Sequence, residues 1–204
     1  MEAILKRIEN QIEFIRETDK EKNILRQTYV GNPLRQENDA EHAWHLAVMT
    51  MVLAEYSNEP IDVERVIKMV TIHDVVEIDA GDTYAYDPVA NQSKRERELK
   101  AAERIFNMLP EDQAREMRGL WDEFEETQTA DAKFALAMDI FHPVIMNDFG
   151  GGAAWREHFV TEEQVRTRIE KMRPGSEKLW EACVRIVERN LENGNIIRNE
   201  AEFK

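Results

Sequence analysis

Apolar residues recur at intervals of three and four along most of this chain, which is the spacing of one buried face of an α-helix. Isoleucines and a leucine give residues 1–17 such a face. The same spacing, with capping residues or glycine and proline at the ends, predicts helices over 39–56, 62–74, 93–108, 110–126, 130–147, from 161 onward, and 176–193. The sequence shows no sustained alternation of apolar and polar residues, so we predict an all-α bundle of about eight helices forming a single domain over residues 1–204.

Polar residues at the predicted helix starts refine these limits. We expect capping boxes at Asn38 with Glu41, at Ser93 with Glu96 and at Thr161 with Gln164. Residues 31–33 are expected to form a turn and residues 81–91 a loop. The helix over 39–56 carries an apolar run that predicts burial on most sides. Pro143 interrupts a helical run, and we expect it to kink that helix or to end it early.

Candidate chemistry is concentrated in residues 71–82, which read Thr-Ile-His-Asp-Val-Val-Glu-Ile-Asp-Ala-Gly-Asp. At a helix end, adjacent His73 and Asp74 can offer one cation an imidazole nitrogen and a carboxylate oxygen. Further ligands are available upstream at His42 and downstream at Asp139, whose apolar neighbours make an unpaired carboxylate costly. Two imidazoles with two carboxylates suit Mn, Fe, Co, Ni or Zn better than Mg or Ca.

The order of these residues resembles the HD superfamily of metal-dependent phosphohydrolases. The similarity is strongest to its 5′-deoxynucleotidase branch, through Ala-Glu-His at 40–42, His-Asp-Val-Val-Glu at 73–77 and Gly-Asp at 81–82. It covers about residues 25–148, with the helices of 161–193 expected to pack on that core. The resemblance implies one divalent transition metal (Mn, Co, Fe, Ni or Zn) and a homodimer. It also implies the metal ligands His42, His73, Asp74 and Asp139 and the catalytic carboxyl groups Glu77 and Asp82.

A dianionic phosphate needs a further cation, and the fork of an arginine suits it. The nucleotidase branch has an arginine before its first ligand histidine, which corresponds to Arg26, with Arg35 as the alternative. The tryptophan that commonly follows the family arginine is missing, and Tyr29 is the candidate to take its place. His45 and His142 are expected to be packed beside the site, whereas Lys94 is interpreted as part of a solvated helix face.

Composition limits the class of substrate and partner. The formal net charge is −14, and a field of that sign repels nucleic acid and anionic membranes. The expected substrate is therefore small and phosphorylated, and its phosphate is expected to be bound by a cation in the site rather than by the overall surface charge. No apolar run is long enough to span a membrane, and a single cysteine indicates no disulfide framework, so we expect a cytoplasmic protein.

Two alternatives stay open on the sequence. One is an HD-type hydrolase of another small phosphate or pyrophosphate ester, such as a deoxynucleoside triphosphate or guanosine tetraphosphate. The other is a dimer in which the metal only joins helices and catalyses nothing. An open metal position beside an acid–base group such as Glu77 distinguishes a catalytic site from a structural one.

Overall fold

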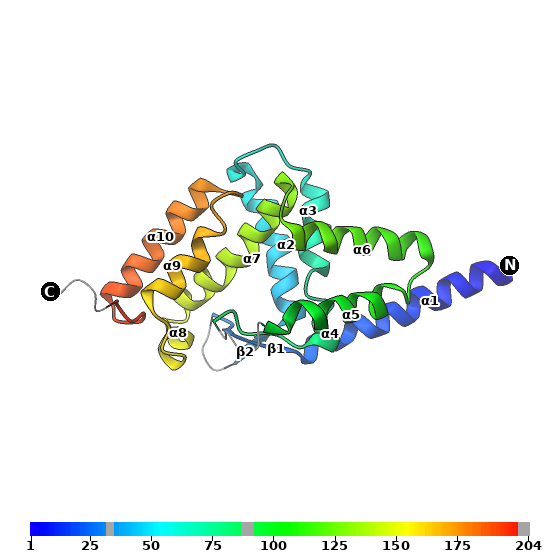
Figure 1. Ribbon diagram of the computed structural model, residues 1–204, viewed down its shortest axis with the longest axis horizontal. Coiled ribbons are helices and arrows are strands. Elements are labelled where there is room, and N and C mark those ends of the chain that lie inside the picture. The colour runs from blue at the N-terminus through cyan, green and yellow to red at the C-terminus, as the bar shows by residue number, and fades with distance from the viewer. Residues whose placement is uncertain (32–34, 87–91, 200–204) are drawn as a thin grey trace.

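The computed structural model describes residues 1–31, 35–86 and 92–199 (Figure 1). Across these residues the chain forms ten α-helices, two short 3-10 helices and one two-stranded sheet. The all-α prediction is confirmed, and the two helices beyond the expected eight are the short α4 and α8. Among the described residues, no helix combines the length and the apolar character needed to span a bilayer.

The N-terminal half contains α1 (Glu2–Thr18), η1 (Asp19–Asn23), β1 (Leu25–Tyr29), β2 (Gln36–Asn38), α2 (Asp39–Leu53), η2 (Ala54–Tyr56), α3 (Val63–Ile72) and α4 (Glu77–Ala80). The C-terminal half contains α5 (Lys94–Phe106), α6 (Glu111–Glu126), α7 (Ala130–Phe149), α8 (Ala153–Glu157), α9 (Glu162–Glu170) and α10 (Glu177–Glu192). These bounds agree closely with the predicted helices.

Helix caps explain several of the boundaries. The predicted capping boxes form at Asn38 and at Thr161, where each side chain accepts a hydrogen bond from the third helical residue. Asp62 caps α3 by accepting from the backbone N–H of Arg65. The capping box predicted at Ser93 is wrong, because that side chain makes no cap hydrogen bond even though α5 begins at the next residue.

The sheet was not predicted. β1 and β2 pair antiparallel, with Leu25 opposite Asn38 and Tyr29 opposite Gln36. Strands of five and three residues are too short to show a sustained period-two pattern. A two-stranded sheet is stabilised by packing on other elements, here α7 and α8 against β1 and α2 against β2, which the sequence does not reveal. Residues 32–33 of the predicted turn and residues 87–91 of the predicted loop lie outside the described residues.

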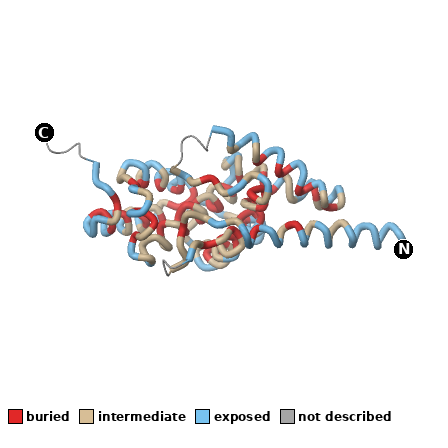
Figure 2. Tube along the Cα trace, turned by 90° about the horizontal axis from the view of Figure 1, so that it is seen from below, coloured by how far each residue is buried: buried red, intermediate tan, exposed pale blue. Residues whose placement is uncertain are grey.

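Helix α7 lies at the centre of the molecule and packs against α2, α3, α6 and α10. Phe134, Met138 and Ile140 on this helix are fully buried, and buried positions follow the middle of the fold in Figure 2. The helix continues past Pro143 to Phe149, so the predicted early end is wrong. Proline removes only the N–H that would bond the carbonyl of Asp139, and packing on several sides outweighs that loss.

Two apolar helix faces remain uncovered. α1 projects from the body, and its stripe is open to solvent, with Ile4 64% and Ile15 65% exposed (Figures 1 and 2). The expectation that α2 is buried on most sides is wrong. Trp44, Met51 and Val52 lie on an exposed face of that helix.

Candidate metal centre

Three helices deliver the predicted ligands to one place. His42 lies in the first turn of α2, which the Asn38 capping box fixes, and His73 is the C-cap of α3 with Asp74 directly after it. Asp139 lies midway along α7. Because α2, α3 and α7 pack against one another, side chains far apart in the sequence converge at their meeting point.

The convergence brings four ligand atoms together. His42 Nε2 lies 3.1 Å from Asp139 Oδ1 and 3.9 Å from Asp74 Oδ2. His73 Nε2 lies 3.2 Å from Asp74 Oδ2 and 3.8 Å from Asp139 Oδ1. Ligands bound at about 2.1 Å are separated by about 3.0 Å at right angles and about 3.4 Å in a tetrahedron, so these spacings fit a common cation.

The state of His73 supports the same assignment. Its Nδ1 lies 3.0 Å from the carbonyl oxygen of Val70, to which it donates, so in the neutral ring the lone pair is on Nε2. That Nε2 atom is buried and has no partner in hydrogen-bond geometry among the described residues. A buried nitrogen lone pair facing two carboxylates fits a metal ion. The set of two imidazoles and two carboxylates fits a divalent transition metal.

The electrostatic field of the site favours a cation. Burial alone raises the pKa of Asp74, but His73 and Arg26 outweigh burial and lower it. Burial likewise opposes the ionised form of Asp139, but the hydrogen bond from His42 and the nearby imidazole of His73 lower its pKa well below the usual range. Burial lowers the pKa of His73, yet Asp74 and Asp139 raise it well above its usual value, so without a metal Nε2 tends to hold a proton that a bound metal ion would replace. The same two carboxylates attract a metal ion.

Arg26 on β1 places a cationic side chain beside these ligands. Its side chain is 11% exposed, and Nη1 donates to Asp74 Oδ2 at 2.6 Å and to Asp39 Oδ1 at 3.2 Å. Asp39 is fully buried. Burial and the neighbouring Asp74 raise the pKa of Asp39 to about 8, although Arg26 acts in the opposite direction.

Glu77, the first residue of α4, adds a carboxyl group to this cluster. Oxygen atoms of Asp39, Asp74 and Glu77 lie within 4.8 Å of one another. Burial, followed by Asp74 and Asp39, raises the pKa of Glu77 well above its usual value, so the side chain tends to hold a proton. α4 ends at Gly81, whose φ of +75° favours glycine, and Asp82 comes next. Burial raises the pKa of Asp82 as well.

A cavity of about 510 Å³ opens beside the ligands. Asp74, Glu77, Asp82 and Asp139 line it together with Arg26. Its walls also include the cationic side chains of Lys94, Arg168 and Lys171 and the aromatic side chains of Tyr84, Tyr86, Phe124 and Trp155. The site therefore has room for a small molecule next to the metal position.

Comparison with known proteins agrees with this geometry. A model of the HD domain family matches residues 18–180. The chain belongs to the HD-domain family. A crystal structure of a predicted metal-dependent phosphohydrolase from Magnetospirillum magnetotacticum has 43% sequence identity and a TM-score of 0.90, covering 94% of this chain and 96% of that one. A conserved hypothetical protein from Pyrococcus furiosus, 22% identical with a TM-score of 0.62, covers 87% of this chain and 99% of its own and shares the fold.

Curated relatives carry a more specific name. The human protein 5′-deoxynucleotidase HDDC2 is 31% identical over 129 residues, which is 63% of this chain and 62% of the human protein. The bovine protein of the same name is 30% identical over 131 residues, covering 64% of this chain and 62% of its own length. The match thus spans less than two thirds of these relatives.

Two predicted substrate residues of this HD-domain chain lie away from the cavity. The hydroxyl of Tyr29 donates to Glu157 at 2.6 Å, and the neighbouring Gln27 and Thr28 line the cavity instead. Arg35 is exposed and pairs with Glu41 of the α2 capping box at 2.8 Å. Of the two arginines considered for phosphate, only Arg26 reaches the site.

Three residues at the site escaped the sequence reasoning. Lys94 lines the cavity, with Nζ 3.3 Å from the buried carboxylate of Glu98, so it contributes to the site as well as to the partly exposed face of α5. Arg168 on α9 lies 3.7 Å from Asp139 Oδ2. Asp39 stands beside the helix cap, where the sequence indicates only a capping role. The sequence offers no local signal for Lys94 or Arg168, which reach the site only through the packing of α5 and α9.

Proposed function

We propose that this HD-domain chain is a metal-dependent phosphomonoesterase that hydrolyses small nucleoside 5′-monophosphates to nucleoside and phosphate. The observation that carries the proposal is that the four candidate metal ligands lie beside a cavity. The buried carboxyl group of Glu77 and the guanidinium of Arg26 line the same cavity. The names of the Magnetospirillum and HDDC2 relatives support the same reaction class.

His42, His73, Asp74 and Asp139 are the residues that would hold the metal. When bound, a divalent cation supplies Lewis-acid stabilisation of phosphoryl oxygens and lowers the pKa of water at the site. Arg26 lies against Asp74, where its guanidinium can contact the phosphate from the side of β1. Lys94 and Arg168 offer further positive charge from α5 and α9.

Glu77 is suited to the proton transfer. Hydrolysis forms a bond from water oxygen to phosphorus and breaks the bond from phosphorus to the 5′ oxygen, which must gain a proton. The raised pKa of Glu77 keeps a proton available beside the cavity. A cation at Asp74 opposes the electrostatic part of that shift, while the contribution of burial remains. Asp82, next to the same cavity, can hold or relay the proton.

Charge in the cavity favours a single phosphate group. Five carboxyl groups (Asp74, Glu77, Asp82, Glu125 and Asp139) and four cationic side chains (Arg26, Lys94, Arg168 and Lys171) are among its described walls. With Glu77 holding its proton and the other groups ionised, one divalent cation leaves the cavity with a small positive charge. A phosphomonoester carries about −1.5 to −2 at neutral pH, which that charge can balance. Each additional phosphate adds negative charge that the carboxyl groups repel.

The remaining walls suit a nucleoside. Tyr84, Tyr86 and Trp155 present aromatic surface for a base, and Gln27 and Thr28 present polar atoms for a sugar. The volume lies within the range of about 300–1,000 Å³ that is usual for small-molecule sites. Open space at the ligands also favours catalysis over a metal that only joins helices, since structural sites are closed. The exposed stripe of α1 supports the proposed homodimer.

The test is phosphate release from a panel of 5′-ribo- and 5′-deoxyribonucleoside monophosphates, with nucleoside triphosphates and guanosine tetraphosphate as further arms. Chelator-stripped protein is reloaded with Mn, Co, Fe, Ni, Zn or Mg in turn. We expect metal-dependent release from monophosphates that Glu77→Gln abolishes while metal content is unchanged. Preferred turnover of the triphosphates or the tetraphosphate, or metal binding without any release, would refute the proposal.

A further inference from the structure

The two candidate histidine ligands are held in different ways. His73 donates from Nδ1 to the carbonyl of Val70, and a carbonyl can only accept. His42 Nδ1 instead lies 3.0 Å from Nδ1 of His142, which is fully buried. A neutral imidazole nitrogen can donate or accept, and Glu37 Oε2 lies farther from His42 Nδ1, at 3.6 Å, so the position of the proton on His42 depends chiefly on the state of His142.

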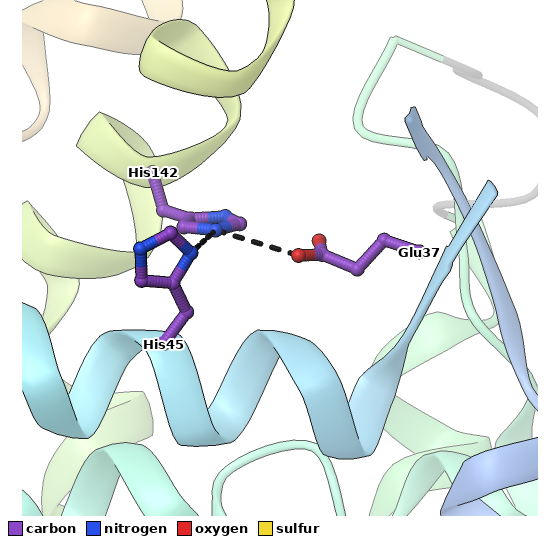
Figure 3. Close-up of side chains that lie close together, drawn as sticks. All are labelled: Glu37, His45 and His142. Carbon is purple, nitrogen blue, oxygen red and sulfur yellow. Dashed lines mark hydrogen bonds and ion pairs between the residues drawn. The ribbon is translucent and has the colours of Figure 1, made fainter. Parts of the chain in front are cut away.

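The surroundings of His142 set that state. Figure 3 shows His142 from α7 meeting His45 from α2 and Glu37 from β2. His142 Nε2 lies 3.0 Å from His45 Nδ1 and 3.4 Å from Glu37 Oε1. Glu37 Oε1 is an acceptor that faces His142 Nε2, so this contact favours a proton on that nitrogen. His142 Nδ1 is then the lone-pair nitrogen, and it can only accept from His42.

The direction of this chain of hydrogen bonds determines which nitrogen of His42 is free. Without a metal, His42 Nε2 donates to Asp139 Oδ1, which lies 3.1 Å away. With a metal bound between these two atoms, donation from His42 Nδ1 to His142 leaves the Nε2 lone pair for the metal. We propose that His142, held by Glu37 and His45, is a positioning residue that fixes the metal-binding tautomer of His42. The inference rests on the metal site of the proposed function.

The same three side chains could themselves suggest a second metal site, because their ligand atoms lie within 4.8 Å of one another. A metal on His142 Nε2 would move the proton of that ring to Nδ1, facing Nδ1 of His42. With a metal on its Nε2, His42 would then have to lose its remaining proton and become an imidazolate. The two sites therefore compete, and we expect one metal per chain.

The test compares His142→Leu with His142→Asn, whose side-chain carbonyl can still accept from His42. Mn²⁺ affinity is measured by competition with a fluorescent chelator. We expect His142→Leu to weaken binding about 10- to 100-fold, the usual effect of losing such a partner, and His142→Asn to stay within about threefold of wild type. Thr50→Val, also fully buried on α2, is the control and should leave affinity unchanged.

A second readout does not depend on any variant that could fail to fold. Long-range ¹H–¹⁵N spectra of the Zn²⁺-loaded wild-type protein should show His42 protonated at Nδ1 and His142 protonated at Nε2. The proposal is overturned by the opposite tautomer of either ring, by two metals per chain, by unaltered affinity in His142→Leu, or by equal losses in both His142 variants.

These measurements use no substrate, which keeps the inference separate from the proposed reaction. A wild-type protein that binds no metal would refute the metal site and the positioning role together. Tight metal binding with the expected tautomers, but no phosphate release, would refute only the proposed reaction.

Discussion

Replacing Arg26 with glutamine tests the electrostatic organisation of the centre. The Arg26 guanidinium lies 2.6 Å from Asp74, 3.2 Å from Asp39 and 3.8 Å from Glu37, and all four side chains are at most 12% exposed. Removing one partner of a buried ion pair costs about 3–5 kcal/mol, because the opposite charge remains buried and unpaired. For a chain of this size each kcal/mol lowers Tm by about 2–4 °C, so we expect a loss of about 6–20 °C.

Arg35→Gln is the matched control. Arg35 makes an ion pair of 2.8 Å with Glu41, but the two side chains are 57% and 39% exposed. Pairs of that kind contribute about 0–1 kcal/mol. Urea unfolding, followed by tryptophan fluorescence, measures both variants in chelator and in saturating Mn²⁺. The metal should reduce the loss in Arg26→Gln, since its charge also compensates Asp74.

A difference below about 1 kcal/mol between the two variants in chelator would contradict the reasoning. Such a small difference would mean that the charges of the buried carboxyl groups are neutralised without Arg26. Proton uptake by Asp39 would neutralise its charge. The pKa of Asp39 is already raised to about 8, and removing Arg26, which lowers that pKa, would raise it further. Repeating the comparison at higher pH would then restore the difference, since the carboxyl groups ionise again.

Three further predictions follow from other parts of the structure. Burial, with Asp74, raises the pKa of Glu21 from 4.5 to about 7, so its folded-state proton is lost as pH rises through 7. Glu21→Gln should therefore stabilise the protein by about 3 kcal/mol at pH 8.5 and hardly at all below pH 4.5, as measured by urea unfolding. Burial raises the pKa of Cys183 to about 12, and a thiol reagent at pH 8 should react with it only at the rate of unfolding. Arg168→Gln should lower kcat/KM for a nucleoside monophosphate about 10- to 100-fold, as expected for a lost charged hydrogen bond, whereas Lys100→Gln on the exposed face of α5 should not.

Most of the helical framework could be predicted because its signals are local. The capping box at Asn38 and the aspartate cap of α3 each depend on residues three apart, so the sequence contains the whole interaction. Pro143 shows where local reasoning fails. The hydrogen bond lost at a proline inside a helix can be predicted from the sequence. Whether the helix continues depends on the packing of α7 against α2, α3, α6 and α10.

The residues of the site also fall into two groups, those with a local sequence signal and those placed only by tertiary packing. His73, Asp74 and Glu77 stand in one short stretch, so their association could be predicted. Lys94 and Arg168 come from α5 and α9, and only tertiary packing turns them toward the cavity. The role inferred for His142 depends on a ring contact across 100 residues of sequence, which no spacing rule describes.

The most direct test of the metal centre is an anomalous difference map from crystals of the Mn²⁺-loaded protein. We predict one peak per chain, about 2.0–2.2 Å from His42 Nε2, His73 Nε2 and one oxygen each of Asp74 and Asp139. No peak at that position, or a peak at Glu37, His45 and His142 instead, would contradict the account.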